Sequence, residues 1–202
     1  MACMNISPVT LEGRHVRLEP LALSHAPALS EVGLDADLWQ WTTTRISTPE
    51  ELRSYIETAL AEQARGVSLP FATIHQATGQ AVGSTRFGSI DAANRRLEIG
   101  WTWIGRHWQR TPVNTEAKYL MLRHAFERLS ALRVEFKTDS LNERSRRAIL
   151  RLGAIEEGTL RNHMITHTGR LRHSVYFSVI DSEWPQVKAS LEAKLSRPFP
   201  PL

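Results

Sequence analysis

The stretch from residue 97 to residue 139 constrains the fold of this chain more than any other. Apolar side chains recur there at the spacing of one helix face, at Ala117, Leu120, Met121, Leu122, Ala125, Phe126 and Leu129, which predicts a helix over residues 115–129. Strand-like segments flank this helix at residues 97–104 and 132–139. Because a helix joins the two strands, we expect one local parallel strand pair in the fold.

The other segments predict an antiparallel sheet interrupted by helices, so the fold class is α+β. Thr48, Pro49 and Glu51 form a helix start signal, and Gly66 follows the end of that helix. Shorter helices are expected from Ser24, over residues 143–152 before Gly153, and from Ser182 onward. The remaining strands are expected at residues 14–20, 69–75, 81–90, 154–162 and 171–180.

Composition predicts one soluble globular domain. The chain has 202 residues, 42% of them hydrophobic, and a formal net charge of +4. No repeat or linker interrupts it, so we expect a single domain over residues 1–202, with residues 196–202 as a flexible tail. Cys3 is the one cysteine, and residues 1–10 lack the pattern of a secretory signal. We therefore expect a cytoplasmic protein with no metal site.

A loop at residues 105–113 joins the strand 97–104 to the central helix. Asn114 is the residue type expected to cap that helix. A helix N-terminus exposes unpaired backbone N–H groups and a partial positive charge, so this strand, loop and helix could hold a pyrophosphate group.

Several motifs together resemble those of one acetyltransferase family. These are Glu98-Ile-Gly-Trp-Thr-Trp-Ile, His107-Trp108, Val113-Asn-Thr-Glu-Ala-Lys118, Asp139-Ser-Leu-Asn-Glu-Arg-Ser145 and Leu152-Gly-Ala154. With residues 11–18 and 181–185 they cover nearly the whole chain and resemble the RimJ/RimL-like branch of the GNAT N-acetyltransferases. The resemblance implies a strongly bent, mostly antiparallel sheet with helices on both faces, in which strands 97–104 and 132–139 splay apart around acetyl-CoA.

The resemblance also implies a set of cofactor-binding residues. Residues 109–114 occupy the place of the family's pyrophosphate loop, in which Pro112 and Asn114 stand where small residues, the first of them glycine, are usual. Proline lacks an N–H and so removes one possible phosphate donor, while Arg110 could compensate by pairing with phosphate. The full predicted set is Trp103, Ile104, Gln109, Arg110, Thr111, Val113, Asn114, Thr115, Asn142 and Ser145.

Two residues are candidates for catalysis. By position in the family, Ser145 would act as a general acid or stabilise the departing thiolate. The alternative for residues 142–145 is helix capping, and Asn142 is a good N-cap by residue type. Ile149 stands where many family members have a tyrosine acid. Glu98 would accept the proton of the attacking amine, directly or through water, or would instead be a structural ion-pair residue. Backbone N–H groups near a distorted end of strand 97–104 would hold the oxyanion.

The leading functional prediction is direct acyl transfer from acetyl-CoA to a primary amine, which is a peptide N-terminus or a small molecule. The alternative is a catalytically impaired GNAT scaffold that senses acyl-CoA or binds a protein. Five tryptophans, at positions 39, 41, 101, 103 and 108, either shape the acceptor pocket or fill the core. The arginines of residues 144–151 either reach phosphates or form a solvated face, and nucleic-acid binding is disfavoured because no recognition motif accompanies them. A homodimer is possible.

Overall fold

The computed structural model describes Met4, residues 6–197 and Phe199. Its centre is a single sheet whose strands lie in the order β1-β2-β3-β4-β5-β6-β8-β7. The strands are β1 Leu11–Glu12, β2 Val16–Pro20, β3 Leu69–His75, β4 Ala81–Asp91, β5 Arg96–Ile104, β6 Arg133–Asp139, β7 Ile155–Ile165 and β8 Leu171–Ile180. All neighbouring strands are antiparallel except β5 and β6, which confirms the expected parallel pair.

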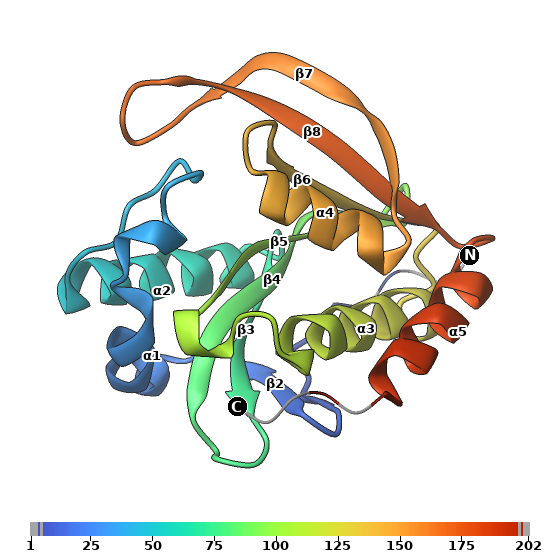
Figure 1. Ribbon diagram of the computed structural model, residues 1–202, viewed down its shortest axis with the longest axis horizontal. Helices are drawn as coiled ribbons and strands as arrows, with labels where there is room; N and C mark the ends of the chain where they lie inside the picture. Colours follow the sequence, from blue (N-terminus) through green and yellow to red (C-terminus); the bar gives the residue numbers. More distant parts are fainter. Residues whose placement is uncertain (1–3, 5, 198, 200–202) are drawn as a thin grey trace.

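The parallel pairing is short. It joins Arg96, Leu97 and Glu98 of β5 to Arg133, Val134 and Glu135 of β6, and it stops there although both strands continue. Beyond Glu98 the two strands diverge, and this is the splayed pair that the family resemblance implies (Figure 1).

Helices cover both faces of the sheet (Figure 1). On one face, α3 (Pro112–Glu127), α4 (Glu143–Leu152) and α5 (Trp184–Leu195) enclose the larger core, which includes Phe87, Phe136 and Phe177. On the other face, α1 (Ala26–Gly33) and α2 (Pro49–Ala64) enclose a smaller core around Trp39 and Trp103. Three short 3-10 helices complete the fold: η1 (Leu23–His25), η2 (Ala36–Leu38) and η3 (Arg106–Trp108).

Local start and stop signals explain where the helices lie. Thr48 caps α2 by accepting a hydrogen bond from Glu51 N, and the Glu51 side chain returns to the Thr48 backbone, as the sequence predicts. Gly153 ends α4 at a φ of 102°, in the left-handed region that favours glycine. Of the expected tail, Ser196 caps the end of α5, whereas positions 198 and 200–202 lie outside the described residues, as does Cys3.

A buried carboxylate ties the N-terminal hairpin to α3. Glu116, the fifth residue of α3, accepts hydrogen bonds from the backbone N–H groups of Arg14, His15 and Val16 at 2.9, 2.6 and 2.7 Å. A Cβ atom at Gly13 would lie 2.5 Å from Glu116 Cδ, so only glycine fits at the turn. A carboxylate with three amide donors is well stabilised although it is buried.

We predict that Glu116→Gln lowers the free energy of unfolding by about 3 kcal/mol, because an amide replaces a charge that accepts three buried hydrogen bonds. Chemical denaturation of the variant and the wild type measures this difference. Glu57→Gln, which changes an exposed glutamate paired only with Arg53, is the matched control and should cost less than about 0.5 kcal/mol. Equal losses in the two variants would contradict the anchoring role.

Candidate active site

A β-bulge distorts β5 at the point where it leaves β6. Ser84 of β4 pairs with Trp103 and Arg86 pairs with Gly100, so two β5 residues stand opposite one β4 residue. Trp101 in the bulge has a φ of 48°, in the left-handed region. Gly88 makes room for its ring, since a Cβ there would lie 2.3 Å from Trp101 Cζ3. The bulge is the distortion that the oxyanion prediction requires, and it turns Trp101 toward the α2 face of the sheet, where its ring lies near the Arg86 guanidinium.

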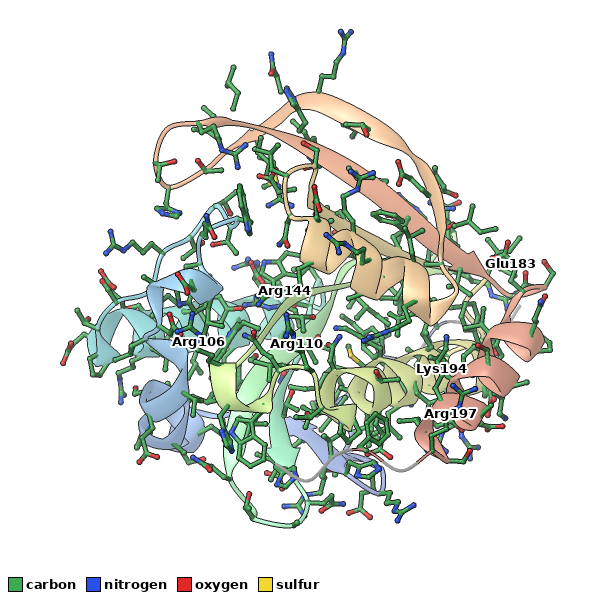
Figure 2. All side chains as sticks on the ribbon, viewed as in Figure 1. Arg106, Arg110, Arg144, Glu183, Lys194 and Arg197 are labelled. Carbon is green, nitrogen blue, oxygen red and sulfur yellow. The ribbon has the colours of Figure 1, made fainter. Side chains whose placement is uncertain are left out.

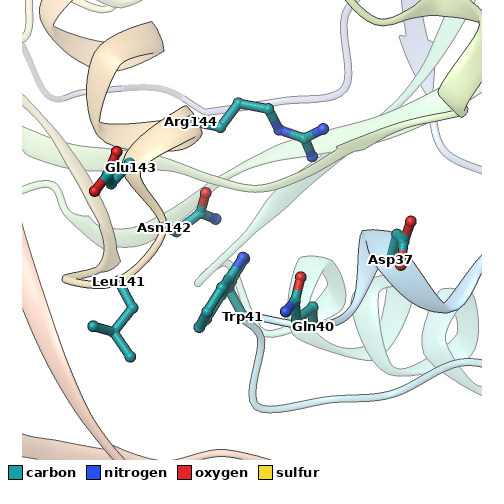
Figure 3. A pocket seen from close by; sticks show the side chains of 7 residues that line it. All are labelled: Asp37, Gln40, Trp41, Leu141, Asn142, Glu143 and Arg144. Carbon is teal, nitrogen blue, oxygen red and sulfur yellow. The ribbon is translucent and has the colours of Figure 1, made fainter.

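The edge of β5 facing β6 is open beyond Glu98. No described strand pairs with it over residues 99–104, so its backbone groups can pair with an extended ligand. A hollow of about 360 Å³ lies nearby, between the loop after η2 and the start of α4 (Figure 3). Trp41 and Asn142 face each other across it in this view. The hollow is lined by Asp37, Gln40, Trp41, Leu141, Asn142, Glu143 and Arg144.

The start of α3 differs from the prediction. The helix begins at Pro112, and Thr111 is the cap, since its Oγ1 accepts a hydrogen bond from Val113 N at 3.3 Å. The prediction that Asn114 caps α3 is therefore wrong. The reason is that Pro112 suits the first helical position, where its fixed φ matches the helix and its missing N–H breaks no intrahelical bond. Arg110 precedes this turn, exposed and at a φ of 63°.

The start of α4 lies beside the loop before α3. Asn142 Oδ1 accepts a hydrogen bond from Ser145 N at 3.0 Å, so Asn142 is a helix cap, one of the two roles considered for it. Ser145 Oγ takes no part in this cap. Arg144 donates to Gln109 Oε1 at 2.7 Å, which joins the two helix starts. Figure 2 shows Arg110 and Arg144 together in the region between α3 and α4.

Four of the predicted cofactor-binding residues bury their side chains. Trp103 packs against Trp39 at 5.7 Å between ring centroids, while Ile104 and Val113 belong to the core on the α3 face and Thr115 is 7% exposed. Ligand contacts from these four would use backbone groups, and their cofactor role stays a prediction. Of the five tryptophans considered for the acceptor pocket, Trp39, Trp103 and Trp108 are core residues, whereas Trp41 and Trp101 are partly exposed.

Glu98 lies at the fork between β5 and β6. Its carboxylate is 2.9 Å from Lys137 Nζ on β6 and accepts a hydrogen bond from Ser89 Oγ at 3.1 Å. The Glu98 side chain is 4% exposed, whereas that of Lys137 is partly exposed, so the carboxylate is the buried member of the pair. Lys137 also lies 5.6 Å from the Trp101 ring centroid. Glu98 is thus an ion-pair residue placed next to the bulge, where its predicted catalytic role stays open.

Comparison with known proteins identifies the family. Residues 15–155 match the family model described as "Acetyltransferase (GNAT) domain". This chain belongs to the GNAT acetyltransferase family.

Related proteins and structures agree with this GNAT assignment. A crystal structure of a GCN5-related N-acetyltransferase from Brucella melitensis is 34% identical, covers 95% of this chain and 87% of that one, and has a TM-score of 0.86. YdaF of Bacillus subtilis, provisionally named a ribosomal N-acetyltransferase, is 32% identical over 52% of this chain and 57% of its own length. RimJ of Mycobacterium smegmatis, solved with CoA-disulfide, is 24% identical with a TM-score of 0.80 over 93% of this chain and 95% of that one, and shares the fold.

Within the described part of the chain, no three His, Cys, Asp or Glu side chains are grouped so that they could hold a metal ion. None of the described helices combines the length and apolar composition of a membrane span.

Sequence reasoning missed a buried lysine behind the bulge of this GNAT domain. Lys118 of α3 is 5% exposed and donates hydrogen bonds to Thr85 Oγ1 at 2.9 Å and to Thr102 Oγ1. No Asp or Glu of the described residues pairs with it. Burial lowers the pKa of Lys118 to about 7. A signal was present, because position 118 lies three residues before Met121 and four before Leu122, on the buried face of the predicted helix.

Lys118 should make stability depend on pH. Between about pH 7 and 10.5 the unfolded chain holds the lysine proton and the folded protein does not, so stability rises with pH in that window and falls as the pH drops toward 7. We expect Lys118→Met to exceed the wild type in stability at pH 7. This advantage should shrink by up to about 1.4 kcal/mol per pH unit as the pH rises toward 10.

Denaturation curves from pH 7 to 10 measure this difference. Lys188→Met is the control, because a hydrogen bond to Glu127 raises the pKa of that exposed lysine and gives it no such window. An advantage of Lys118→Met that does not change with pH would contradict the prediction.

Proposed function

We propose that this GNAT domain transfers an acetyl group from acetyl-CoA to a primary amine by direct attack. The observation that carries the proposal is the open edge of β5, which begins at the fork with β6 and lies beside the first turns of α3 and α4. An extended thioester arm along that edge would place its reacting end at the bulge and its phosphates at the helix starts.

The residues present fit a CoA pyrophosphate. In the first turn of α3, Asn114 N has no partner within the helix, and the helix dipole favours a negative group there. Arg110 is exposed, and among the described residues its guanidinium donates no hydrogen bond, so it is available to phosphate. Pro112 removes one N–H from this site but also fixes the start of the helix.

The chain would assist the chemistry at two positions. Acetyl-CoA supplies the acyl group as a thioester, and the amine nitrogen replaces the sulfur, which leaves as a thiolate. Ser145 Oγ, in the first turn of α4, would donate to that sulfur. Glu98 would take the amine proton through an ordered water, because its carboxylate is buried against Lys137. The bulged N–H groups of β5 would hold the carbonyl oxygen.

The acceptor we propose is an α-amine of a peptide or small molecule. An α-amine has a pKa of about 8, so a larger fraction is neutral near pH 7 than for a lysine with a pKa of about 10.4. Such an amine needs only a weak base. The name of YdaF supports a ribosomal protein N-terminus as one candidate acceptor.

Calorimetric titration with acetyl-CoA and with CoA tests cofactor binding. We expect saturable binding by the wild type and about three- to tenfold weaker binding by Arg110→Gln, because one charged phosphate contact is lost. Arg53→Gln removes an exposed arginine of α2 and should bind like the wild type. If both variants bind equally, Arg110 does not contact the cofactor.

The same titration separates an enzyme from an impaired scaffold. If the wild type binds neither ligand and Pro112→Gly binds both, the missing N–H has abolished the cofactor site and the scaffold alternative holds. If the wild type binds acetyl-CoA and releases free thiol when a primary amine is added, the enzyme assignment holds.

Ser145→Ala should lower kcat about a hundredfold and change the Kd for acetyl-CoA less than threefold. Alanine keeps the N–H that bonds to Asn142, so the cap of α4 is retained and only the hydroxyl is lost. Ser196→Ala, beyond the end of α5, is the control. A kcat within twofold of the wild type would remove Ser145 from the mechanism.

A further inference from the structure

Charged side chains gather on the face of β4, β5, β6 and β8 opposite α3. Strand alternation puts Arg86 and Glu98 on this face, and Lys137, Asp139 and Arg172 project to it from β6 and β8. Three ion pairs account for most of them: Arg86 with Glu62 at 2.8 Å, Lys137 with Glu98 at 2.9 Å, and Arg170 with Asp139. Arg96 and Arg133, on the same face of β5 and β6, also have carboxylate partners, so among the described basic side chains of this face only Arg172 has no ion pair.

The unpaired charge belongs to Arg172. It is 9% exposed, and its Nε has no hydrogen-bond acceptor among the described residues. No described Asp or Glu forms an ion pair with it, although the charges of Asp139 and Glu98 act on it from farther away. Burial lowers the pKa of Arg172, yet arginine remains charged at neutral pH. A buried guanidinium with an unused donor is costly unless a ligand supplies the acceptor.

Arg172 lies beside the proposed reaction centre. It shares its face of β8 with Ser174 and Tyr176, which stand opposite Asp139 and Lys137 of β6. Lys137 in turn contacts Glu98 at the fork. The Arg172 side chain therefore lies on the sheet face that carries Glu98 and Trp101, away from the α3 and α4 helix starts that would hold CoA.

The tip of the β7–β8 hairpin contacts the loop after η2. The Arg170 guanidinium lies 5.7 Å from the Trp41 ring centroid, and His167 Nδ1 lies 3.3 Å from Thr42 O. Trp41 also lines the hollow of Figure 3. Arg172 thus lies two residues in sequence from the contact between the β7–β8 hairpin and Trp41.

We propose that Arg172 binds a carboxylate of the acceptor, so that the enzyme selects amines that carry a nearby carboxylate over their neutral analogues. This inference rests on the proposed function. A single carboxylate matches the one unpaired charge, whereas a doubly charged phosphate would add repulsion from Asp139 and Glu98. The planar guanidinium can hold a carboxylate through two parallel hydrogen bonds.

The test compares acceptors that differ in one charge. Peptides with N-terminal Ser-Asp or Ser-Asn form one pair, and a free amino acid and its amide form the other, so the carboxylate can come from a side chain or from the main chain. We expect wild-type kcat/KM to favour the acidic member of at least one pair by at least tenfold. Arg172→Gln should reduce that preference to less than twofold, mainly by raising KM for the acidic member.

Two variants control for structure. Arg172→Lys keeps the charge and should retain part of the preference, whereas a merely structural arginine would not give this rescue. Arg53→Gln removes an exposed arginine of α2 that pairs with Glu57 and should keep the preference. Circular dichroism and acetyl-CoA titration show whether each variant is folded and still binds its cofactor.

Each outcome decides a different question. An equal rate with both members of both pairs, or a preference that survives in Arg172→Gln, overturns the carboxylate site. If the wild type binds acetyl-CoA and acetylates none of these amines, a binding titration replaces the assay. It follows the intrinsic tryptophan fluorescence, to which Trp41 and Trp101 contribute, as the same ligands are added. Acidic ligands should then bind the wild type at least tenfold more tightly than Arg172→Gln, and equal binding would overturn the inference without bearing on the cofactor site.

Discussion

The short parallel contact between β5 and β6 is the constraint on which the site depends. Three residue pairs join the strands, and the connection through α3 fixes their common direction. After these pairs the strands separate, and the bulge at Trp101 turns β5 away at the same place. Lys137 of β6 and the buried Glu98 of β5 form an ion pair across the opening. The strand pairs and this ion pair therefore hold the gap in place, and the backbone groups of β5 beyond Glu98 have no strand partner on this side among the described residues.

The two faces of the sheet divide the chemistry between them. On the α3 face, two helix starts, Arg110 and Arg144 gather where an anionic cofactor would lie. On the opposite face, Arg86, Lys137 and Arg172 are held among carboxylates and the ring of Trp101. In the proposed reaction, a group bound on one face would meet a group bound on the other at the fork. Such a division suits a reaction between two substrates that must be distinguished before they meet.

Local patterns predicted most of the fold. The apolar spacing within residues 115–129, the Thr48 capping box and the left-handed Gly153 each act within one or two helix turns, and all appear in the structure. The cap of α3 was predicted wrongly because Thr111 and Asn114 are both capping residue types, and Pro112 at the first helical position selects Thr111. The burial of Lys118 was not predicted although the helix spacing indicated it, whereas the burial of Arg172 depends on strands distant in sequence. The choice of Ser145 and Glu98 as catalytic candidates came from family resemblance, and spacing alone would not have provided it.

The contact of Glu116 with the hairpin turn has a consequence for how the chain assembles. Its three amide donors precede it by 100 to 102 positions in the sequence. During synthesis the β1–β2 turn emerges long before the carboxylate that holds it, so the turn cannot form these three hydrogen bonds until residue 116 is available. Closing so large a loop is slow compared with forming local helices. The contact between the N-terminal turn and α3 therefore belongs to the late, long-range steps of folding, although β2 can pair with β3 earlier.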